Sequence, residues 1–347
     1  MSISEENVPL QYGLESQPCT YSECNYIYKG QNFYPVPVVD LKGRLHDCDP
    51  EIRASLVQQL VEAGSVGAFC VVNHGINEKL LADFKRASNT FFSLPLEEKL
   101  KCSKTPVPGC QRPVGYQGQF QNLTQKAFIV QRREVFEIQG SPSTESRDLV
   151  PWPESVPSFR GCLEAFAEDM RVLSKWMMEA LAEGLGLRKD AFLKQIGGGD
   201  FHQQVVVCSY PIMDKQPKEI INPSSIAFGA HSDLPVMNIV VEDYAGGVQV
   251  FHDDCWLNVK PIPEGVTFFL GDPMECMSNG MFHAMIHRVK APETSSRFSC
   301  VSTLEPIDKA AAMIQPIPEL LERSGIPAKD GVFYMGSCPQ GSVSEGY

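Results

Sequence analysis

The spacing of hydrophobic residues predicts long helices in the first half of the chain. In three segments, apolar side chains recur at every third or fourth position, which is the period of a helix with one buried face. These segments are residues 51–63, 78–92 and 158–187. The third carries Gly184 and Gly186 near its end, where a helix is expected to stop.

Short apolar runs separated by turn residues dominate the second half. They are rich in Val and Phe and are interrupted by Gly-Gly and Asp-Asp pairs, a pattern that favours a jelly-roll barrel over a parallel sheet. The expected strands here are 204–207, 237–241, 248–251, 266–270 and 298–302. Earlier strands are expected at 34–41, 67–72 and 133–138, and a short late helix at 319–324. The predicted fold class is therefore mostly β with flanking helices around a jelly-roll core.

These elements suggest four consecutive parts. They are an N-terminal extension (1–34), an N-terminal α/β region (35–150), a jelly-roll core with its long supporting helix (151–310), and a C-terminal helix and tail (311–347) that is a candidate cover for an active site.

Composition and charge narrow the class of protein. A chain of 347 residues with 43% hydrophobic residues can bury a large core. The net charge of −12 argues against nucleic acid as a general partner, because no excess of cations is available to displace counterions. No secretory signal and no membrane span are recognisable, so a cytoplasmic protein without a membrane partner is expected. The oligomeric state stays open.

The twelve cysteines are scattered, and no Cys-x-x-Cys pair occurs. Without a secretory signal, reduced thiols are expected rather than disulfides. A structural zinc site needs closely paired ligands, so none is predicted.

A small set of metal-type residues is the main chemical signal. His231 and Asp233 are followed by His287 and then by Arg297 and Ser299. Two imidazoles and one carboxylate hold a non-haem Fe(II) on one face and leave positions open for oxygen and a co-substrate. Alternate side chains of a strand point the same way, so His231 and Asp233 are expected to reach one metal together. A guanidinium and a hydroxyl on one face suit a carboxylate.

The ordered motifs resemble those of the Fe(II)/2-oxoglutarate-dependent dioxygenases, in the branch that includes isopenicillin N synthase, cephalosporin synthases and the plant flavonoid and gibberellin oxygenases. The segments PVPVVDL, GAFCVVNHGI and FFSLPLEEKLK match the opening pattern of that family. The segments AHSD, SNGMFHAMIHRV and RFS match its metal and co-substrate motifs. The resemblance covers most of the chain, from Pro35 to Leu304.

The resemblance implies a double-stranded β-helix and a requirement for Fe(II), 2-oxoglutarate and O2, with ascorbate as an expected stimulant. His231, Asp233 and His287 are then the metal ligands and the catalytic centre. A C–H bond of a small organic molecule, expected to be a specialised metabolite, is hydroxylated, desaturated or rearranged, and succinate and CO2 are released.

The resemblance also assigns residues to the co-substrate. Arg297 and Ser299 bind the distal carboxylate of 2-oxoglutarate, and Tyr210 reaches the same molecule. Many plant members have Asn two residues before that tyrosine, where this chain has Cys208. This departure is expected to weaken one hydrogen bond to the co-substrate and to leave the metal site unaffected.

Three other functions remain open at this point. An iron oxidase of the isopenicillin N synthase type does not use 2-oxoglutarate yet keeps the same Arg-x-Ser motif. The complete ligand set argues against a binding protein that has lost its chemistry, and the lack of a general base argues against a zinc hydrolase. His283 is a competing ligand four residues before His287, but its segment is expected to be loop and strand.

Substrate contacts are the hardest feature to predict. In the family, substrates enter through the open end of the barrel, which is lined partly by the loop around residues 112–125. The candidates are Arg112, Arg133, Phe136 and Phe251.

Overall fold

The computed structural model describes residues 32–42, 49–108, 110–118, 133–141, 145–198, 200–212, 226–292, 295–309, 311–329 and 333–334. Most of the predicted N-terminal extension, half of the loop 112–125 and most of the tail that follows the C-terminal helix lie outside the described residues.

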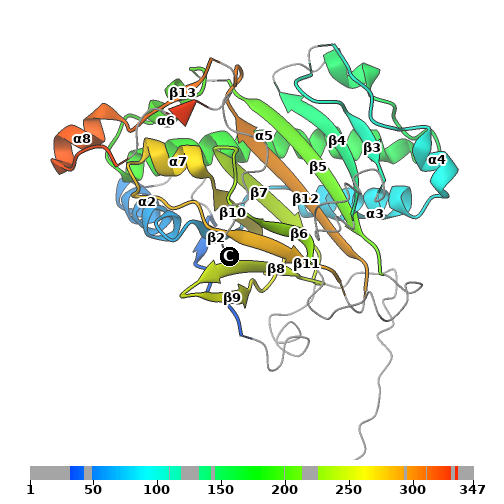
Figure 1. Ribbon diagram of the computed structural model, residues 1–347, viewed down its shortest axis with the longest axis horizontal. Helices are drawn as coiled ribbons and strands as arrows, with labels where there is room; N and C mark the ends of the chain where they lie inside the picture. Colours follow the sequence, from blue (N-terminus) through cyan, green and yellow to red (C-terminus); the bar gives the residue numbers. More distant parts are fainter. Residues whose placement is uncertain are drawn as a thin grey trace, which may run out of the picture.

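A large mixed sheet forms the centre of the molecule (Figure 1). Neighbouring strands are antiparallel except for the parallel pair at one edge, β1 and β2. The spatial order of its strands is β1 (Val38–Asp40), β2 (Ala68–Val72), β10 (Val266–Leu270), β7 (Met237–Glu242), β12 (Arg297–Glu305), β5 (His202–Tyr210), β4 (Glu134–Ser141) and β3 (Gly115–Gln117). The expected N-terminal region and jelly-roll core therefore contribute strands to one sheet.

A second sheet of four antiparallel strands lies against one side of the large sheet (Figure 1). Its order is β6 (Ile226–His231), β11 (His287–Lys290), β8 (Val248–His252) and β9 (Cys255–Asn258). Val248 and Val250 of this sheet pack with Phe269 of β10, so the two sheets enclose a common interior. This arrangement and the structural relatives described below confirm the jelly-roll core. A third, two-stranded sheet joins β13 (Met313–Ile314) and β14 (Phe333–Tyr334).

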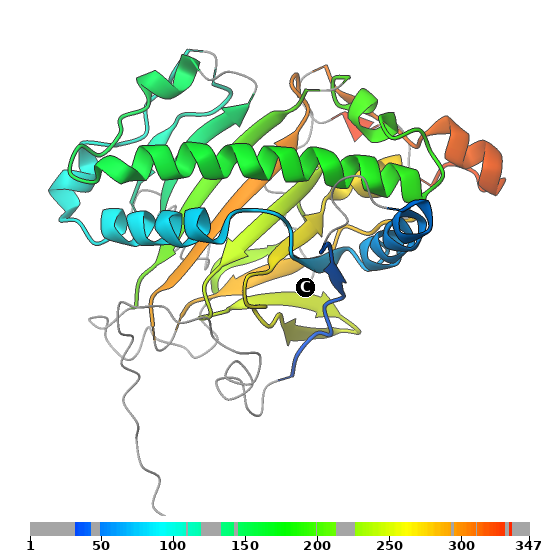
Figure 2. The same ribbon diagram turned by 180° about the vertical axis from the view of Figure 1, so that it is seen from behind.

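Helices cover the opposite face of the large sheet (Figure 2). The longest, α5 (Pro157–Gly184), runs across this face beside α2 (Pro50–Gly64) and α3 (Glu78–Phe92). Asn77 begins α3 by accepting a hydrogen bond from the backbone N–H of Leu80 at 3.0 Å. The shorter helices are α4 (Leu96–Leu100), η1 (Glu145–Leu149), α6 (Ala191–Gln195), α7 (Asp272–Met277) and α8 (Pro318–Ser324).

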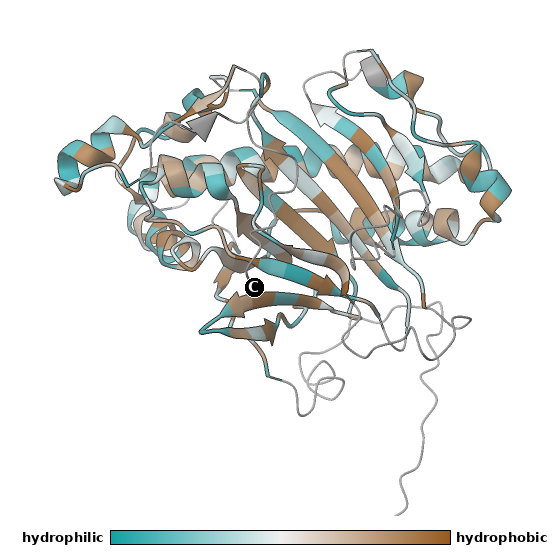
Figure 3. Cartoon of the chain, viewed as in Figure 1, coloured by the Kyte–Doolittle hydropathy of each residue, from teal (hydrophilic) through white to brown (hydrophobic). Residues whose placement is uncertain are grey.

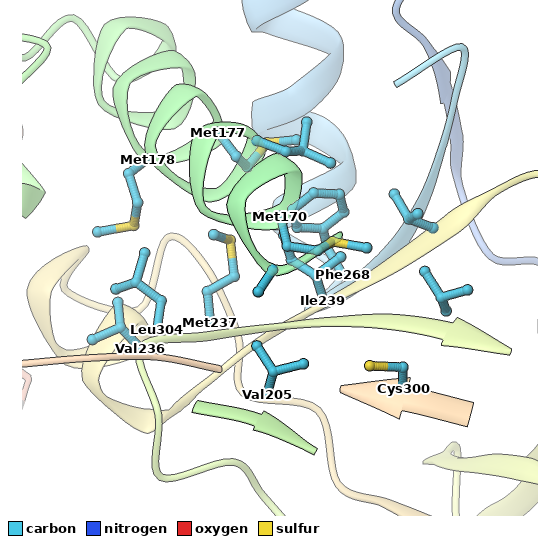
Figure 4. Packing of buried hydrophobic residues seen from close by; sticks show 14 of the residues in the cluster. Met170, Met177, Met178, Val205, Val236, Met237, Ile239, Phe268, Cys300 and Leu304 are labelled. Atoms are coloured by element: carbon cyan, nitrogen blue, oxygen red, sulfur yellow. The ribbon is translucent and has the colours of Figure 1, made fainter. Parts of the chain in front are cut away.

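Strand alternation separates the two faces of the large sheet. Met237 and Ile239 of β7 and Leu304 of β12 lie in the core beside α5 (Figure 4). Side chains alternate along a strand, so the residues between them face the interior shared with the small sheet. Figure 3 shows hydrophobic residues running along the central strands of the large sheet.

The expected elements agree closely with these bounds. Helix 78–92 and strand 266–270 coincide with α3 and β10. The helix expected at 158–187 ends at Gly184 as α5, and the strand expected at 34–41 is shortened to β1. The short helices α4, α6 and α7 were not anticipated, because a single turn leaves too few positions for a period to be recognised.

No helix among the described residues is long and apolar enough to cross a membrane. The cysteines in the described part of the chain are free thiols.

Candidate metal centre

His231, Asp233 and His287 meet between the two sheets. His231 is the last residue of β6 and pairs directly with His287, the first residue of β11. The Asp233 Oδ1 atom lies 3.6 Å from His231 Nε2 and 3.8 Å from His287 Nε2. One ligand atom from each residue lies within 4.8 Å of the others, a spacing that suits a shared metal ion.

Asp233 reaches the cluster differently from the expectation. β6 ends at His231, so Asp233 is not on a strand and strand alternation does not orient it. Instead its carbonyl oxygen accepts a hydrogen bond from the N–H of Asp272 at 2.9 Å. Gly271 makes this approach possible, because a Cβ atom there would lie 2.5 Å from the Asp233 oxygen.

Backbone carbonyls orient both imidazoles. The Nδ1 atom of His231 lies 2.8 Å from the carbonyl oxygen of Gly229, and that of His287 lies 2.9 Å from the carbonyl oxygen of Met285. A hydrogen on Nδ1 satisfies these contacts and leaves each Nε2 as a free acceptor that faces the cluster. Burial and the neighbouring His287 lower the pKa of His231 to about 4, so this imidazole is neutral at neutral pH.

The carboxylate of Asp233 has an unused buried atom. Its Oδ2 is enclosed and has no hydrogen-bond partner among the described residues. A buried carboxylate oxygen without a partner is costly, and a cation would satisfy it. Two imidazoles whose Nε2 atoms face the cluster and this carboxylate therefore fit a divalent metal such as Fe(II).

Aromatic rings hold the imidazoles from outside the cluster. Phe269 of β10 stacks on His287 with a centroid distance of 4.5 Å. The Phe228 ring meets His231 edge-on at 4.6 Å. These contacts restrict rotation of the two ligand rings and keep the surroundings apolar.

Arg297 and Ser299 form a second polar group on the inward face of β12. Arg297 is 2% exposed, and its Nη1 atom donates to Ser299 Oγ at 3.0 Å. Its guanidinium lies over the Tyr210 ring, 4.8 Å from the centroid. The Nη2 atom donates to the carboxylate of Glu242 at 2.7 Å. The three residues expected to bind a carboxylate are thus brought together, but with a buried acid already among them.

Arg133 also faces this interior, because it precedes β4 and lies on the same side as Val135. Its guanidinium stacks over the Phe228 ring at 4.3 Å, and its Nη1 atom lies 3.8 Å from the Sγ atom of Cys208. No ion pair of Arg133 with an acid is found among the described residues.

The other three substrate candidates lie elsewhere. Phe136 is fully buried on the helix side of β4, where its ring packs against Phe159 of α5. Phe251 follows the inward Val250, so it points outward and packs against Trp256. Arg112 forms an ion pair of 3.1 Å with Glu305, at the opposite end of β12 from Arg297. The structure does not bring these side chains to the metal cluster.

Glu242 and Phe269 are the main site residues that the sequence did not suggest. Neither belongs to a local sequence motif, and only the register of neighbouring strands reveals its partner. Glu242 is directly opposite Ser299 on β12, more than fifty positions away in the chain. His283, the competing histidine, is 56% exposed and lies 3.6 Å from Glu275 rather than in the cluster.

Two family models match the chain. The N-terminal domain described as "non-haem dioxygenase in morphine synthesis N-terminal" matches residues 36–157. The 2OG-Fe(II) oxygenase superfamily matches residues 201–306, which include the metal cluster, Arg297 and Ser299.

Curated relatives and solved structures agree with these models. The chain is 30% identical to flavonol synthase/flavanone 3-hydroxylase of Arabidopsis thaliana over 82% of this chain and 79% of that enzyme. It is 28% identical to leucoanthocyanidin dioxygenase of Petunia hybrida over 84% of this chain, a match that spans 65% of the petunia enzyme, just under two thirds of its length.

Among solved structures, JOX2 in complex with 2OG, Fe and JA has a TM-score of 0.68 at 27% identity, over 83% of this chain and 82% of that one. The dioxygenase for auxin oxidation in rice has a TM-score of 0.69 at 23% identity, over 86% and 92%, and supports the fold alone.

Proposed function

The chain belongs to the 2OG-Fe(II) oxygenase superfamily, and from this premise we propose that it is a dioxygenase that uses Fe(II), 2-oxoglutarate and O2 to oxidise a C–H bond of a small organic molecule. The reaction is a hydroxylation, a desaturation or a ring rearrangement. The single observation that carries the proposal is the meeting of two oriented imidazoles and one buried carboxylate with an unpartnered oxygen.

His231, Asp233 and His287 are the proposed metal ligands. These residues would hold Fe(II), which would supply the activation of O2 coupled to conversion of 2-oxoglutarate to succinate and CO2. The chain's own residues orient the ligand atoms and exclude water. The carbonyls of Gly229 and Met285 fix the imidazoles, and Phe269 shields one side of the cluster.

Arg297, Ser299 and Tyr210 are the proposed binding group for the distal carboxylate of 2-oxoglutarate. A guanidinium with a neighbouring hydroxyl supplies directed donors, and the Arg297 Nε atom is buried without a partner in the described part of the chain. Arg133 supplies a second positive charge on the same interior and is the one substrate candidate from the sequence that we retain.

A small organic substrate agrees with the flavonoid-oxidising relatives. Specialised metabolism, a cytoplasmic location and the absence of nucleic-acid and membrane partners complete the proposal. The acidic net charge supports the absence of a nucleic-acid partner, because the chain has no excess of cations to displace counterions. The flavonoid-oxidising relatives support a role in specialised metabolism.

Anaerobic titration of the purified protein with Fe(II) and then 2-oxoglutarate tests the proposed function. Appearance of a weak visible charge-transfer band is expected when the keto acid chelates the metal. Iron binding without the band would instead favour the oxidase alternative, in which 2-oxoglutarate is not used. Succinate release with candidate flavanones then measures turnover.

A further inference from the structure

Three polar side chains lie side by side across the middle of the large sheet. Thr303 of β12 is in direct register with Gln204 of β5 on one side and with Asn238 of β7 on the other. Residues directly opposite one another on neighbouring strands project to the same face. We call Gln204, Thr303 and Asn238 the polar row.

The polar row faces the interior between the two sheets. The neighbours of its members in sequence, Val205, Met237 and Leu304, pack on the other face against the methionines of α5 (Figure 4). Because side chains alternate along a strand, the polar row points away from α5 and toward the small sheet.

Each member of the row has a buried polar atom without a partner. The Gln204 Oε1, Thr303 Oγ1 and Asn238 Oδ1 atoms make no hydrogen bond within the described part of the chain. Exposure of the three residues is 0%, 7% and 7%. A buried polar atom without a hydrogen-bond partner destabilises the fold, so three of them in register on adjacent strands require an explanation.

The row borders the metal cluster. Asn238 is in register with Phe269 of β10, whose ring stacks on His287 at 4.5 Å. The carbonyl of Leu304, the residue after Thr303, accepts a hydrogen bond from the N–H of Val236 at 2.8 Å, in the segment that leads from Asp233 to β7. A molecule held on the row would therefore lie next to the metal.

An apolar row separates the polar row from the proposed co-substrate group. Val301 is in register with Val206 and Val240, one inward position from the polar row and one from Ser299. The inward face thus changes from polar to apolar and back to polar along β12. Co-substrate and substrate can then occupy different ends of this face.

The charges beside the row select the class of ligand. The Gln204 Nε2 atom donates to Glu137 at 3.4 Å, which leaves Oε1 as the free acceptor. Glu137 is itself paired with Lys104 at 2.6 Å, so it offers no uncompensated charge. Two amide oxygens and one hydroxyl favour a neutral group with N–H or O–H donors.

We propose that the polar row binds the substrate through N–H or O–H donors of an uncharged polar edge and so holds the C–H bond to be oxidised beside the metal. This inference rests on the proposed function, since it takes His231, Asp233 and His287 as the metal ligands. It adds a substrate class: neutral compounds with hydrogen-bond donors, such as cyclic amides or polyhydroxylated ring systems.

A binding experiment with matched probes tests the proposal. The full chain, loaded anaerobically with Fe(II) and 2-oxoglutarate, is screened by ligand-observed NMR against neutral fragments in pairs that differ only by methylation of the donor. The pairs include 2-piperidone with N-methyl-2-piperidone, and the flavanone naringenin with its tri-O-methyl ether. Affinities of the pairs that bind are then measured for the wild type and for Thr303→Val, Asn238→Leu and Thr303→Ser.

The expected result is that donor-bearing members bind about tenfold more tightly than their methylated partners. Thr303→Val and Asn238→Leu should reduce that preference about fivefold each, whereas Thr303→Ser, which keeps the hydroxyl, should retain it. Equal or tighter binding of the methylated members, unchanged preference in both apolar variants, or no binding by any donor-bearing member would overturn the proposal.

Titration of the same samples with 2-oxoglutarate separates this proposal from the proposed function. A normal charge-transfer band with no donor preference rejects only the role of the polar row. Loss of the band in the wild type rejects the metal and co-substrate assignment on which the inference rests.

Discussion

The guanidinium of Arg297 donates a hydrogen bond of 2.7 Å to the carboxylate of Glu242, and both side chains are buried. Ser299, directly opposite Glu242 on the neighbouring strand, accepts from the other terminal nitrogen of Arg297. The arginine proposed to bind 2-oxoglutarate is thus already neutralised by the protein. An incoming carboxylate must share this arginine with a buried like charge.

Glu242→Gln is therefore expected to tighten 2-oxoglutarate binding. The amide keeps the shape of the side chain and a hydrogen-bonding oxygen but removes the negative charge. We expect the dissociation constant to fall about tenfold, which corresponds to about 1.4 kcal/mol. Calorimetric titration of the anaerobic Fe(II) protein measures it. Glu137→Gln, the same change on the inward face of β4, is the control and should have little effect on 2-oxoglutarate affinity. Weaker binding of 2-oxoglutarate in Glu242→Gln would show instead that the carboxylate helps to hold Arg297 in place.

The same pair predicts a pH dependence of co-substrate affinity. Burial raises the pKa of Glu242, against the opposing effect of Arg297. A bound carboxylate raises it further, so binding takes up a proton and affinity falls as the pH rises above the pKa of Glu242 in the free protein. Asp243 and Lys85 are the other charged groups that act on Glu242. Affinity measured across pH should slope in the wild type and be flat in Glu242→Gln; a slope that persists would point to Asp243 instead.

Removal of the proposed metal carboxylate should separate metal binding from folding. Asp233→Ala is expected to abolish turnover and to weaken Fe(II) binding at least a hundredfold, because only two imidazoles remain. The melting temperature of the metal-free protein should not fall, since the variant removes a buried oxygen that has no partner among the described residues. Asp272→Asn changes a neighbouring acid that accepts from Ser232 and serves as the control, with metal affinity retained. Full activity in Asp233→Ala would exclude the metal assignment.

The sequence predicted most of the long helices and core strands and the cluster of His231, Asp233 and His287. It did not predict the direction in which every side chain points. The predicted bounds of helix α3 and strand β10 were correct, because the hydrophobic pattern of each runs without interruption from end to end. The substrate candidates depended on which face of a strand a residue occupies, and a shift of one position reverses it. Phe136 follows the inward Val135 and therefore faces α5.

The sequence also did not identify interior residues whose partners lie on other strands. Glu242, Thr303 and Asn238 carry no local motif, and their meaning comes from registers between strands far apart in the chain. Only the pairing of strands in the folded chain brings these side chains beside their partners. The four-part division of the chain stays a prediction.

Two arginines that looked equivalent in the sequence should behave differently. Arg133→Gln is expected to lower kcat/KM at least tenfold, because it removes the charge that stacks on Phe228 inside the barrel. Arg112→Gln should leave kcat/KM unchanged and lower stability by less than about 1 kcal/mol, because its ion pair is partly exposed. Steady-state kinetics and chemical denaturation of both variants give the comparison. Reversed effects would show that Arg112, and not Arg133, supports turnover.

Glu305, at the end of β12, should affect the stability of the fold rather than the reaction. Burial opposes its ionisation, but the hydrogen bond from His202 and the charges of Arg112 and Lys309 lower its pKa to about 2. A carboxylate whose pKa is lower in the folded than in the unfolded chain stabilises the fold above its ordinary pKa. That contribution is lost as the pH falls from the ordinary value toward 2. Glu305→Gln should therefore lower the free energy of unfolding by about 2–3 kcal/mol at neutral pH.

The difference between the two proteins should shrink in denaturant titrations as the pH is lowered through this window, because protonation makes the wild-type carboxyl as neutral as the amide. A difference that stays constant with pH would assign the stability to packing of the side chain. Metal binding and co-substrate affinity serve as internal controls, since Glu305 lies at the opposite end of β12 from Arg297. Both should be unchanged in folded Glu305→Gln, which would show that the buried charge network supports the barrel without taking part in the reaction.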